Sequence, residues 1–290
     1  MPSLPSEPGP DKTEPATAGR PPKISVVMAV FNGAETLQQA LDSVFEQRYP
    51  HWEIVVMDGG STDGSKEILE RNASRIAYWE SAPDRGVCHA WNKALDHVSG
   101  DWICFLGADD RYHDPDVFGA IAAELPGEDS EIQIVYGQLA RLKPDGWVYH
   151  RGGKPWTGKM KRRFNSGVMI PHPSTFHRRS VFEERGRFDE SFRIAGDYEW
   201  LLRELPYRAP LFVPVLVVDM APGGLSNRPS TAMRMAREVY TARYINGRVR
   251  TPPWRSKRLW AQLAQLWFAF HVQPLVTRAT SPFRRPSTTR

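Results

Sequence analysis

The chain has 290 residues, 41% of them hydrophobic, so a substantial core is expected in one large domain or in a domain with an appendage. Its two cysteines, Cys88 and Cys104, exclude a disulfide framework, lack metal-ligand spacing and favour a reducing compartment. The formal net charge of +5 is unevenly distributed: residues 226–290 hold 13 of the 38 Lys and Arg residues and one acidic residue, Glu238, which gives this tail +12 and the rest of the chain −7.

The amino terminus is expected to be a disordered leader. Residues 1–22 are rich in Pro, Ser and Gly and lack the apolar core of a signal peptide. No apolar run reaches the roughly 18 residues that a membrane-spanning helix needs, so no transmembrane helix is expected. We therefore expect a leader over 1–22, a domain over 23–225 and a basic helical tail over 226–290.

The first half of the chain alternates apolar, β-rich runs with segments of helical periodicity. Strands are expected at Lys23–Val30, Trp52–Met57, Ile76–Trp79 and Asp101–Leu106, and helices at Glu35–Gln47, from Ser65 through Leu69, and at Gly86–Val98. This alternation predicts an α/β fold, with a mostly parallel, Rossmann-like sheet flanked by helices.

The pattern changes after Asp110. Strands or a hairpin are expected at Ile132–Tyr136 and Gly137–Tyr149, a mobile loop at Arg151–Asn165, short helices at Val181–Arg185 and Tyr198–Glu204, and a last strand at Leu211–Asp219. Pro144-Asp145-Gly146 is the expected turn of the hairpin.

Two adjacent carboxylates, Asp109 and Asp110, follow the apolar strand that contains Trp102 to Leu106. Ligands of open α/β sheets bind beyond the carboxyl ends of the strands. Two acids there are suited to hold a divalent cation that shares its other positions with phosphate. The alternative is a solvated turn, because Asp is common in turns.

A second turn, Asp58 to Ser65, is rich in glycine and opens a helix. Glycines let the backbone approach a ligand, and a helix N-terminus favours anionic groups, so a nucleotide site is one interpretation. The turn matches no phosphate-binding fingerprint, and an ordinary strand-to-helix connection is the alternative.

Several short segments are each common, but their occurrence together and in this order is specific. They are Ser25–Gly33, Asp58–Ser65, Pro83–Gly86 with Ala90–Lys93, Gly100–Asp110, Pro171–Phe176, Phe188–Glu190, Ala195–Trp200 and Gly223–Ser226. Over roughly residues 23–226 the chain resembles the family 2 glycosyltransferases of the GT-A fold. The branch that it resembles comprises bacterial transferases of capsule, exopolysaccharide, O-antigen and glycolipid assembly. Phe105–Asp110 and Gly223–Ser226 are similar to mycobacterial phenolic-glycolipid transferases.

The resemblance implies a nucleotide-diphosphate sugar donor, with UDP as the first candidate and GDP or dTDP as alternatives. It implies a Mg²⁺ or Mn²⁺ ion and transfer to a hydroxyl of a lipid-linked or glycan acceptor, with inversion at the anomeric carbon. Inversion needs one in-line displacement, and therefore one general base that takes the proton of the acceptor hydroxyl. The metal would neutralise charge on the departing diphosphate.

The resemblance also implies roles for individual residues. Asp110 and Asp109 would hold the metal, although Gly107 stands where many relatives have the first acid of that motif. The residues implied to bind the nucleotide sugar, together with Asp109, are Phe31, Asn32, Asp58, Asp84 and Arg85. Gly59 stands where many relatives have a second Asp beside Asp58. The alternative for Asp84 is a helix N-cap.

Asp197 matches the catalytic base of the family, and it precedes a short helix, so N-capping is the alternative. Glu199, two residues further on, is the other candidate base. His172 is a candidate for contact with the diphosphate, the metal or the acceptor. A lone histidine is more often structural, and that alternative stays open.

The tail suggests a membrane surface. Leu259, Leu263, Leu266, Trp267 and Phe270 share one helical face, flanked by Trp260 and Phe268, and basic residues lie on both sides of this segment. A basic helix with an aromatic apolar face is typical of a membrane-surface element, and docking onto the domain or a partner is the alternative. Lys159, Lys161, Arg162 and Arg163 are expected either to guide a lipid-diphosphate acceptor or an anionic membrane, or to be a solvated loop. These observations predict a cytoplasmic protein at the inner face of the plasma membrane.

Two other classes of function compete with the transferase. A sugar-nucleotide-forming nucleotidyltransferase would carry a cation in the loop after the first strand, whereas Phe31–Glu35 has none. A non-catalytic module could bind a polyanion through the +12 tail. The apolar aromatic face fits a membrane better than nucleic acid, so no nucleic-acid partner is expected.

Overall fold

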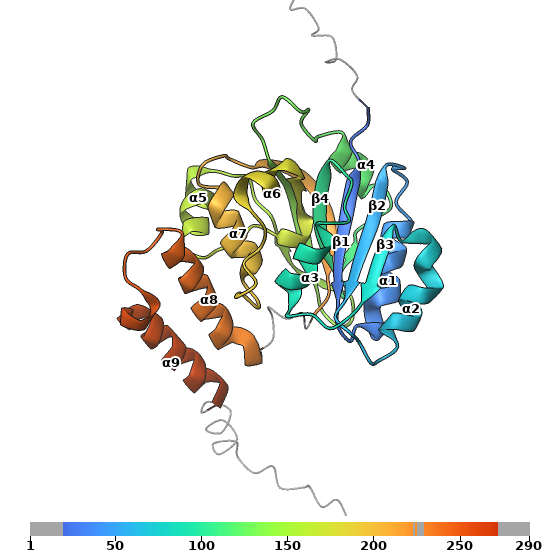
Figure 1. Ribbon diagram of the computed structural model, residues 1–290. Coiled ribbons are helices and arrows are strands. Elements are labelled where there is room, and N and C mark those ends of the chain that lie inside the picture. Colours follow the sequence, from blue (N-terminus) through green and yellow to red (C-terminus); the bar gives the residue numbers. More distant parts are fainter. Residues whose placement is uncertain (1–19, 223, 225–228, 272–290) are drawn as a thin grey trace, which may run out of the picture.

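The computed structural model describes residues 20–222, 224 and 229–271. Among them, nine strands form a single mixed sheet in the order β3-β2-β1-β4-β8-β6-β9-β5, with β7 paired to β6. The sheet runs through the molecule with helices on both of its faces (Figure 1). The α/β fold class expected from the sequence is confirmed, with a sheet that is parallel in one half and mixed in the other.

The strands and helices have the following bounds. The strands are β1 (Ile24–Val30), β2 (Trp52–Asp58), β3 (Tyr78–Ser81), β4 (Trp102–Gly107), β5 (Arg111–Tyr112), β6 (Ile134–Leu142), β7 (Val148–Gly152), β8 (Thr175–Arg178) and β9 (Leu211–Met220). The helices are α1 (Ala34–Phe45), α2 (Ser65–Asn72), α3 (Val87–Ala94), α4 (Val117–Ala122), α5 (Gly158–Asn165), α6 (Ser180–Arg185), α7 (Gly196–Glu204), α8 (Ala232–Ile245) and α9 (Lys257–His271).

Strands β1 to β4 are parallel, and β1 lies between β2 and β4. Successive side chains of a strand point to opposite faces of the sheet. Val26 and Met28 therefore pack with Leu37 and Leu41 of α1 in one hydrophobic cluster, whereas Val27 packs in a second cluster on the other face. Burial on both faces explains why these strands are continuous apolar runs in the sequence.

The other half of the sheet is built around β6, which is antiparallel to β7 and β8 and parallel to β9. The predicted hairpin forms, and its turn is closed by Lys143 N–H donating to the Trp147 carbonyl at 2.9 Å. The prediction of a mobile loop over Arg151–Asn165 is wrong for its second half, which is α5. Thr157 accepts a hydrogen bond from Met160 N–H at the start of this helix, and Phe164 is fully buried at its end.

The basic tail packs against the body of the protein. Helix α8 lies against α7, and α9 lies beside α8 (Figure 1). Ala242 of α8 is fully buried, and Leu259 and Leu263 of α9 are also buried. Part of the apolar face of the tail is therefore used for packing within the chain. None of the described helices is long and apolar enough to cross a bilayer. The side chains of Phe268 and Phe270, and residues 272–290, lie outside the description.

Candidate active site

The carboxyl ends of β1, β2 and β4 bring three loops to one edge of the sheet. Val30 is paired with Asp58, and Ala29 with Gly107, so the strands end at the same level. The predicted residues Asn32, Asp58 and Asp109 thus come from separate segments to one place. This is the edge at which open α/β sheets bind their ligands.

The loops after β1 and β2 are tied to each other. Asn32, which has a left-handed backbone (φ 49°), accepts a hydrogen bond from Thr62 N–H at 3.0 Å, and its own N–H donates to Ser61 Oγ at 2.8 Å. Asp58 is 1% exposed and accepts hydrogen bonds from Ser61 N–H at 3.0 Å and from Ser81 Oγ at 2.6 Å. Asp58 therefore anchors the loop, while Phe31 beside it is exposed.

Asp84 crowds the space beside Gly59. A Cβ atom at Gly59 would lie 2.8 Å from Asp84 Oδ2 and 3.3 Å from the ring of Phe31, so a second Asp does not fit here without a shift. Asp84 also accepts a hydrogen bond from Gly86 N–H at 2.7 Å, close to the start of α3. The carboxylate of Asp84 thus has a local role at α3 and also lies beside Gly59 in the loop after β2. Arg85 is exposed and paired with Glu190.

Asp109 and Asp110 converge beside Gly107. A Cβ atom at Gly107 would lie 2.8 Å from Asp109 Oδ1 and 3.1 Å from Asp110 Oδ2. Asp110 accepts a hydrogen bond from Ala221 N–H at 3.1 Å. Burial, and then the charge of Asp109, raise the pKa of Asp110 to about 8. Two crowded carboxylates, one of them buried, form a donor set that a hard divalent cation would satisfy.

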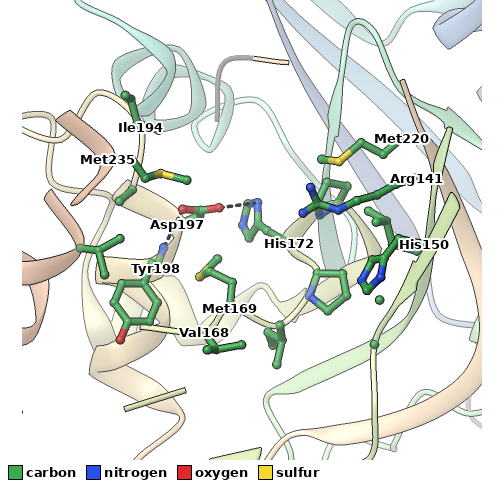
Figure 2. A pocket seen from close by; sticks show the side chains of 18 residues that line it. Arg141, His150, Val168, Met169, His172, Ile194, Asp197, Tyr198, Met220 and Met235 are labelled. Carbon is green, nitrogen blue, oxygen red and sulfur yellow. Dashed lines mark hydrogen bonds and ion pairs between the residues drawn. The ribbon is translucent and has the colours of Figure 1, made fainter. Parts of the chain in front are cut away.

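Two cavities meet at Asp197 and His172. A cavity of about 190 Å³ is lined by Asp109 and Asp110, and a larger one of about 340 Å³ lies beside it. Asp197 and His172 line both cavities. Figure 2 shows the two side chains pointing toward one another at the centre of the larger cavity, with Met169, Met220 and Met235 around them.

Asp197 lies in the first turn of α7, where its Oδ1 accepts a hydrogen bond from Tyr198 N–H at 2.7 Å. Ala195, rather than Asp197, is the N-cap residue. The side chain is 22% exposed, and its Oδ2 lies 4.0 Å from His172 Nδ1. Burial raises the pKa of Asp197 to about 6. A carboxylate poised near neutral pH at a cavity wall can accept a proton from a bound hydroxyl.

His172 is 5% exposed in an aromatic cage. Its ring lies 5.2 Å from the rings of Trp91 and Phe105, measured between centroids. Burial, and then the nearby His177, hold the pKa of His172 well below its usual value, so the ring is neutral. Within the described part of the chain, its Nε2 atom has no hydrogen-bond partner. A buried, unsatisfied ring nitrogen is costly unless a ligand or water completes it.

Other predicted residues lie away from the two cavities. Glu199 is buried and paired with Arg203, and its Oε1 accepts a hydrogen bond from Asn246, the residue that follows α8, at 3.1 Å. This pairing gives Glu199 a structural role. The basic cluster of α5 is exposed, and Lys161 donates to the Pro206 carbonyl at 3.1 Å.

Glu238 is the residue that sequence analysis counted only as a charge. Its carboxylate accepts hydrogen bonds from the backbone N–H groups of Arg193, Ile194 and Ala195, at distances between 2.8 and 3.2 Å. These three residues precede α7, so the tail holds the segment that leads to Asp197. One acidic residue in an otherwise basic tail was the signal available in the sequence.

The larger cavity also contains side chains that the motifs did not indicate. Arg141 comes from β6, His150 from β7, and Met235 and Val239 from α8 (Figure 2). Among the described residues, no group of three or more His, Cys, Asp or Glu side chains is placed to hold a metal ion. A cation at Asp109 and Asp110 would therefore need further ligands from elsewhere, such as substrate phosphate.

Comparison with known proteins gives a consistent result. A model of the family described as "Glycosyl transferase family 2" matches residues 25–186. An uncharacterized glycosyltransferase of Mycobacterium tuberculosis is 32% identical over 215 residues, which cover 73% of this chain and 80% of that protein. A PGL/p-HBAD biosynthesis glycosyltransferase of Mycobacterium bovis is 29% identical, over 71% of this chain and 80% of that protein.

Solved structures show the same fold at low sequence identity. S. aureus TarS 1–349, in complex with UDP-GlcNAc, superposes with a TM-score of 0.60 at 16% identity and covers 86% of this chain and 73% of that one. The mannosyltransferase PcManGT from Pyrobaculum calidifontis, in complex with GDP-Man and Mn²⁺, gives a TM-score of 0.59 at 20% identity, over 89% of this chain and 74% of that one.

Proposed function

The chain belongs to glycosyl transferase family 2, and from this premise we propose that it is an inverting glycosyltransferase of cell-envelope polysaccharide or glycolipid synthesis. It would move a sugar from a nucleotide-diphosphate sugar to a hydroxyl of a lipid-linked or glycan acceptor. The observation that carries the proposal is the position of Asp197, which lines both the cavity with Asp109 and Asp110 and the larger cavity beside it.

The smaller cavity would take the sugar and diphosphate of the donor, and the nucleotide would lie over the loops after β1 and β2. Phe31 and Asn32 belong to the first of these loops, and Asp84, which follows β3, lies beside Gly59 of the second. Asp58 anchors the loop after β2. UDP is the nucleotide that we propose, with GDP and dTDP as the alternatives. The ligands named for the solved neighbours, UDP-GlcNAc and GDP-Man, support a nucleotide-sugar donor.

Asp109 and Asp110 would hold Mg²⁺ or Mn²⁺. Their convergence beside Gly107 and the burial of Asp110 support this assignment. Such an ion supplies positive charge to the leaving diphosphate. The protein itself contributes the two carboxylates and the cavity of about 190 Å³ that they line.

Asp197 would act as the general base. It accepts the proton of the acceptor hydroxyl while that oxygen bonds to the anomeric carbon, and the bond from that carbon to the diphosphate oxygen breaks on the opposite face. The raised pKa, about 6, brings the proton affinity of Asp197 closer to neutral pH. Neutral His172 stands 4.0 Å from Asp197 and would orient the carboxylate or a substrate oxygen.

The larger cavity would take the acceptor. Its lining is largely apolar and includes Met169, Met220 and Met235, while Arg141 and His150 contribute polar groups at one side (Figure 2). This mixture suits an amphiphilic acceptor whose hydroxyl is next to an apolar group, which favours a lipid-linked molecule. A transferase with such an acceptor would work at the inner face of the plasma membrane, with its basic tail at the surface.

Thermal unfolding with UDP, GDP and dTDP, each with and without Mn²⁺, tests the donor site. A ligand that binds the folded state raises the unfolding temperature. We expect a Mn²⁺-dependent rise with one nucleotide, and its loss in an Asp110→Ala variant. A rise that is equal in the variant would contradict the assignment of Asp110. The anomeric configuration of the transfer product, measured by NMR, tests inversion, and a retained configuration would refute it.

A further inference from the structure

The junction of α8 and α9 forms an open cationic hollow, which no step of the proposed transfer reaction uses. A cavity of about 540 Å³ lies between the last turns of α8 and the first turn of α9. Five cationic side chains line it, namely Arg243, Arg250, Arg255, Lys257 and Arg258. No acidic side chain is among the described residues of the lining. A cavity with this charge attracts an anion.

These cations are not neutralised within the described part of the chain. None of the ion pairs found there includes any of the five, and Arg243 donates through Nε to the Asn165 carbonyl at 2.9 Å. The only acidic residue of the tail, Glu238, is occupied by the backbone N–H groups before α7. The positive charge of the cavity is therefore available to a ligand.

Hydrogen bonds hold the chain segments that line the cavity. Ser256 is buried, and its Oγ accepts a hydrogen bond from Leu259 N–H at 3.1 Å, which fixes the first turn of α9. On the opposite wall, Tyr240 donates to the Thr251 carbonyl at 3.1 Å and so joins α8 to the connecting segment. The volume exceeds that of a single small ion and accommodates a phosphate with the group attached to it.

Three exposed tryptophans lie in the same segment as the cationic residues. Trp254 precedes Arg255 and is 68% exposed, while Trp260 and Trp267 of α9 are 56% and 51% exposed. Residues seven apart lie on the same side of a helix, so Trp260 and Trp267 share the side of α9 that also carries Lys257. Tryptophan is enriched where a protein meets the headgroup region of a membrane.

We propose that the cavity between α8 and α9 binds the headgroup phosphate of an anionic phospholipid, with Trp254, Trp260 and Trp267 in the adjoining interface of the bilayer. The inference rests on the proposed action at a membrane surface, and it adds a discrete site to what would otherwise be diffuse attraction. Five cations around one cavity, together with tryptophans beside it, favour a lipid phosphate over a soluble anion.

Vesicle co-sedimentation of the full chain at about 0.15 M salt tests the proposal, because attraction between exposed charges more than about 8 Å apart is largely screened there. The probes are phosphatidylcholine vesicles with and without phosphatidylglycerol. The site variant carries Arg255→Gln, Lys257→Gln and Arg258→Gln. The matched control carries Arg278→Gln, Arg284→Gln and Arg285→Gln, which remove the same number of charges from the same tail.

We expect binding only when phosphatidylglycerol is present, and a loss in the site variant at least about tenfold larger than in the control. Equal losses of vesicle binding in the two variants would show that diffuse charge of the tail, and not a discrete site, causes the binding. Equal binding to both kinds of vesicle would exclude an anionic headgroup. Competition by millimolar inorganic phosphate would indicate a soluble anion, and tighter binding to duplex DNA would indicate a polyanion site.

Two further measurements separate this proposal from the proposed transferase. The unfolding temperature of the site variant without ligand tests whether it is folded, and its rise with nucleotide and Mn²⁺ reports the donor site. A normal nucleotide response with lost vesicle binding supports the lipid site. Normal vesicle binding in a chain that no nucleotide stabilises would leave the lipid site standing and count against the transferase.

Discussion

The donor side and the acceptor side of the proposed active site are held in different ways. On the donor side, residues close in sequence to β1 and β2 tie their own loops together, as Asn32 does with Thr62 and Asp58 with Ser61. On the acceptor side, the segment before Asp197 is held by Glu238, which is 41 residues further along the chain than Asp197. Local motifs thus build one side, and packing of the tail builds the other.

Replacing the proposed base tests the acceptor side most strongly. We expect Asp197→Asn to lower kcat by about 10²–10⁴-fold, since the variant cannot accept the proton. Nucleotide-induced stabilisation should be unchanged. Because burial raises the pKa of Asp197, ionised Asp197 costs folding free energy at neutral pH, and the variant should be about 1–3 kcal/mol more stable to unfolding. Loss of activity with loss of stability would contradict this explanation.

Glu199→Gln is the matched control for that variant. It removes a carboxylate from the same helix, but one that is paired with Arg203 and lies outside both cavities. We expect lower stability, because Arg203 loses its charged partner and keeps the Arg185 and Arg187 carbonyls, and a much smaller change in kcat. A loss of kcat equal to that of Asp197→Asn would make Glu199 the base.

The pH dependence of kcat/KM provides a second test of the same carboxylate. The pKa of Asp197 is raised to about 6, and the base works only when it is ionised. We therefore expect kcat/KM to fall about tenfold for each pH unit below 6, and to level off above it. The residual activity of Asp197→Asn should lack this acidic limb. A limb that persists in the variant would assign it to another group.

A Glu238 variant tests whether the donor side and the acceptor side are held independently. We expect Glu238→Ala to lower the free energy of unfolding by about 1–3 kcal/mol, since three backbone N–H groups lose their charged acceptor. Chemical denaturation measures this loss. The variant should also lower kcat/KM while the nucleotide response stays normal. A weakened nucleotide response would show that the two sides are not held independently.

The smallest effect is expected on the donor side. Ser81→Ala removes one of the hydrogen bonds to Asp58 and leaves those from Ser61 in place. We expect a loss of about 1 kcal/mol in the free energy of unfolding and little change in kcat. Kinetic assays and denaturation at one temperature would measure both quantities. A large loss of kcat would mean that the donor loops are less redundant than their contacts indicate.

The sequence predicted those parts of the site that depend on residues close together in the chain. The ends of the parallel strands, and with them Asp58, Asp109 and Asp110, followed from buried apolar runs that stop at polar turns. Helix α5 was missed because its polar residues dominate the composition, while a single buried side chain, Phe164, holds its end against the core.

Long-range contacts were beyond the reach of sequence patterns. The spacing of Gly59 and Asp84 in the sequence does not show that the Asp84 carboxylate lies beside Gly59. Arg141 and His150 reach the larger cavity only because β6 and β7 pair across the sheet. Glu238 belongs to the same class: its charge stands out in the basic tail, but its partners are backbone N–H groups that no side-chain pattern identifies.

Helix α8 carries Glu238 toward the segment before Asp197 and Arg243 toward the cationic cavity. A ligand that favours one position of this helix therefore acts on that segment as well. Thermodynamic linkage makes such an effect reciprocal: if an occupied cavity tightens acceptor binding by some factor, a bound acceptor tightens lipid binding by the same factor. The affinity for the acceptor and the affinity for the lipid would then both report the position of α8.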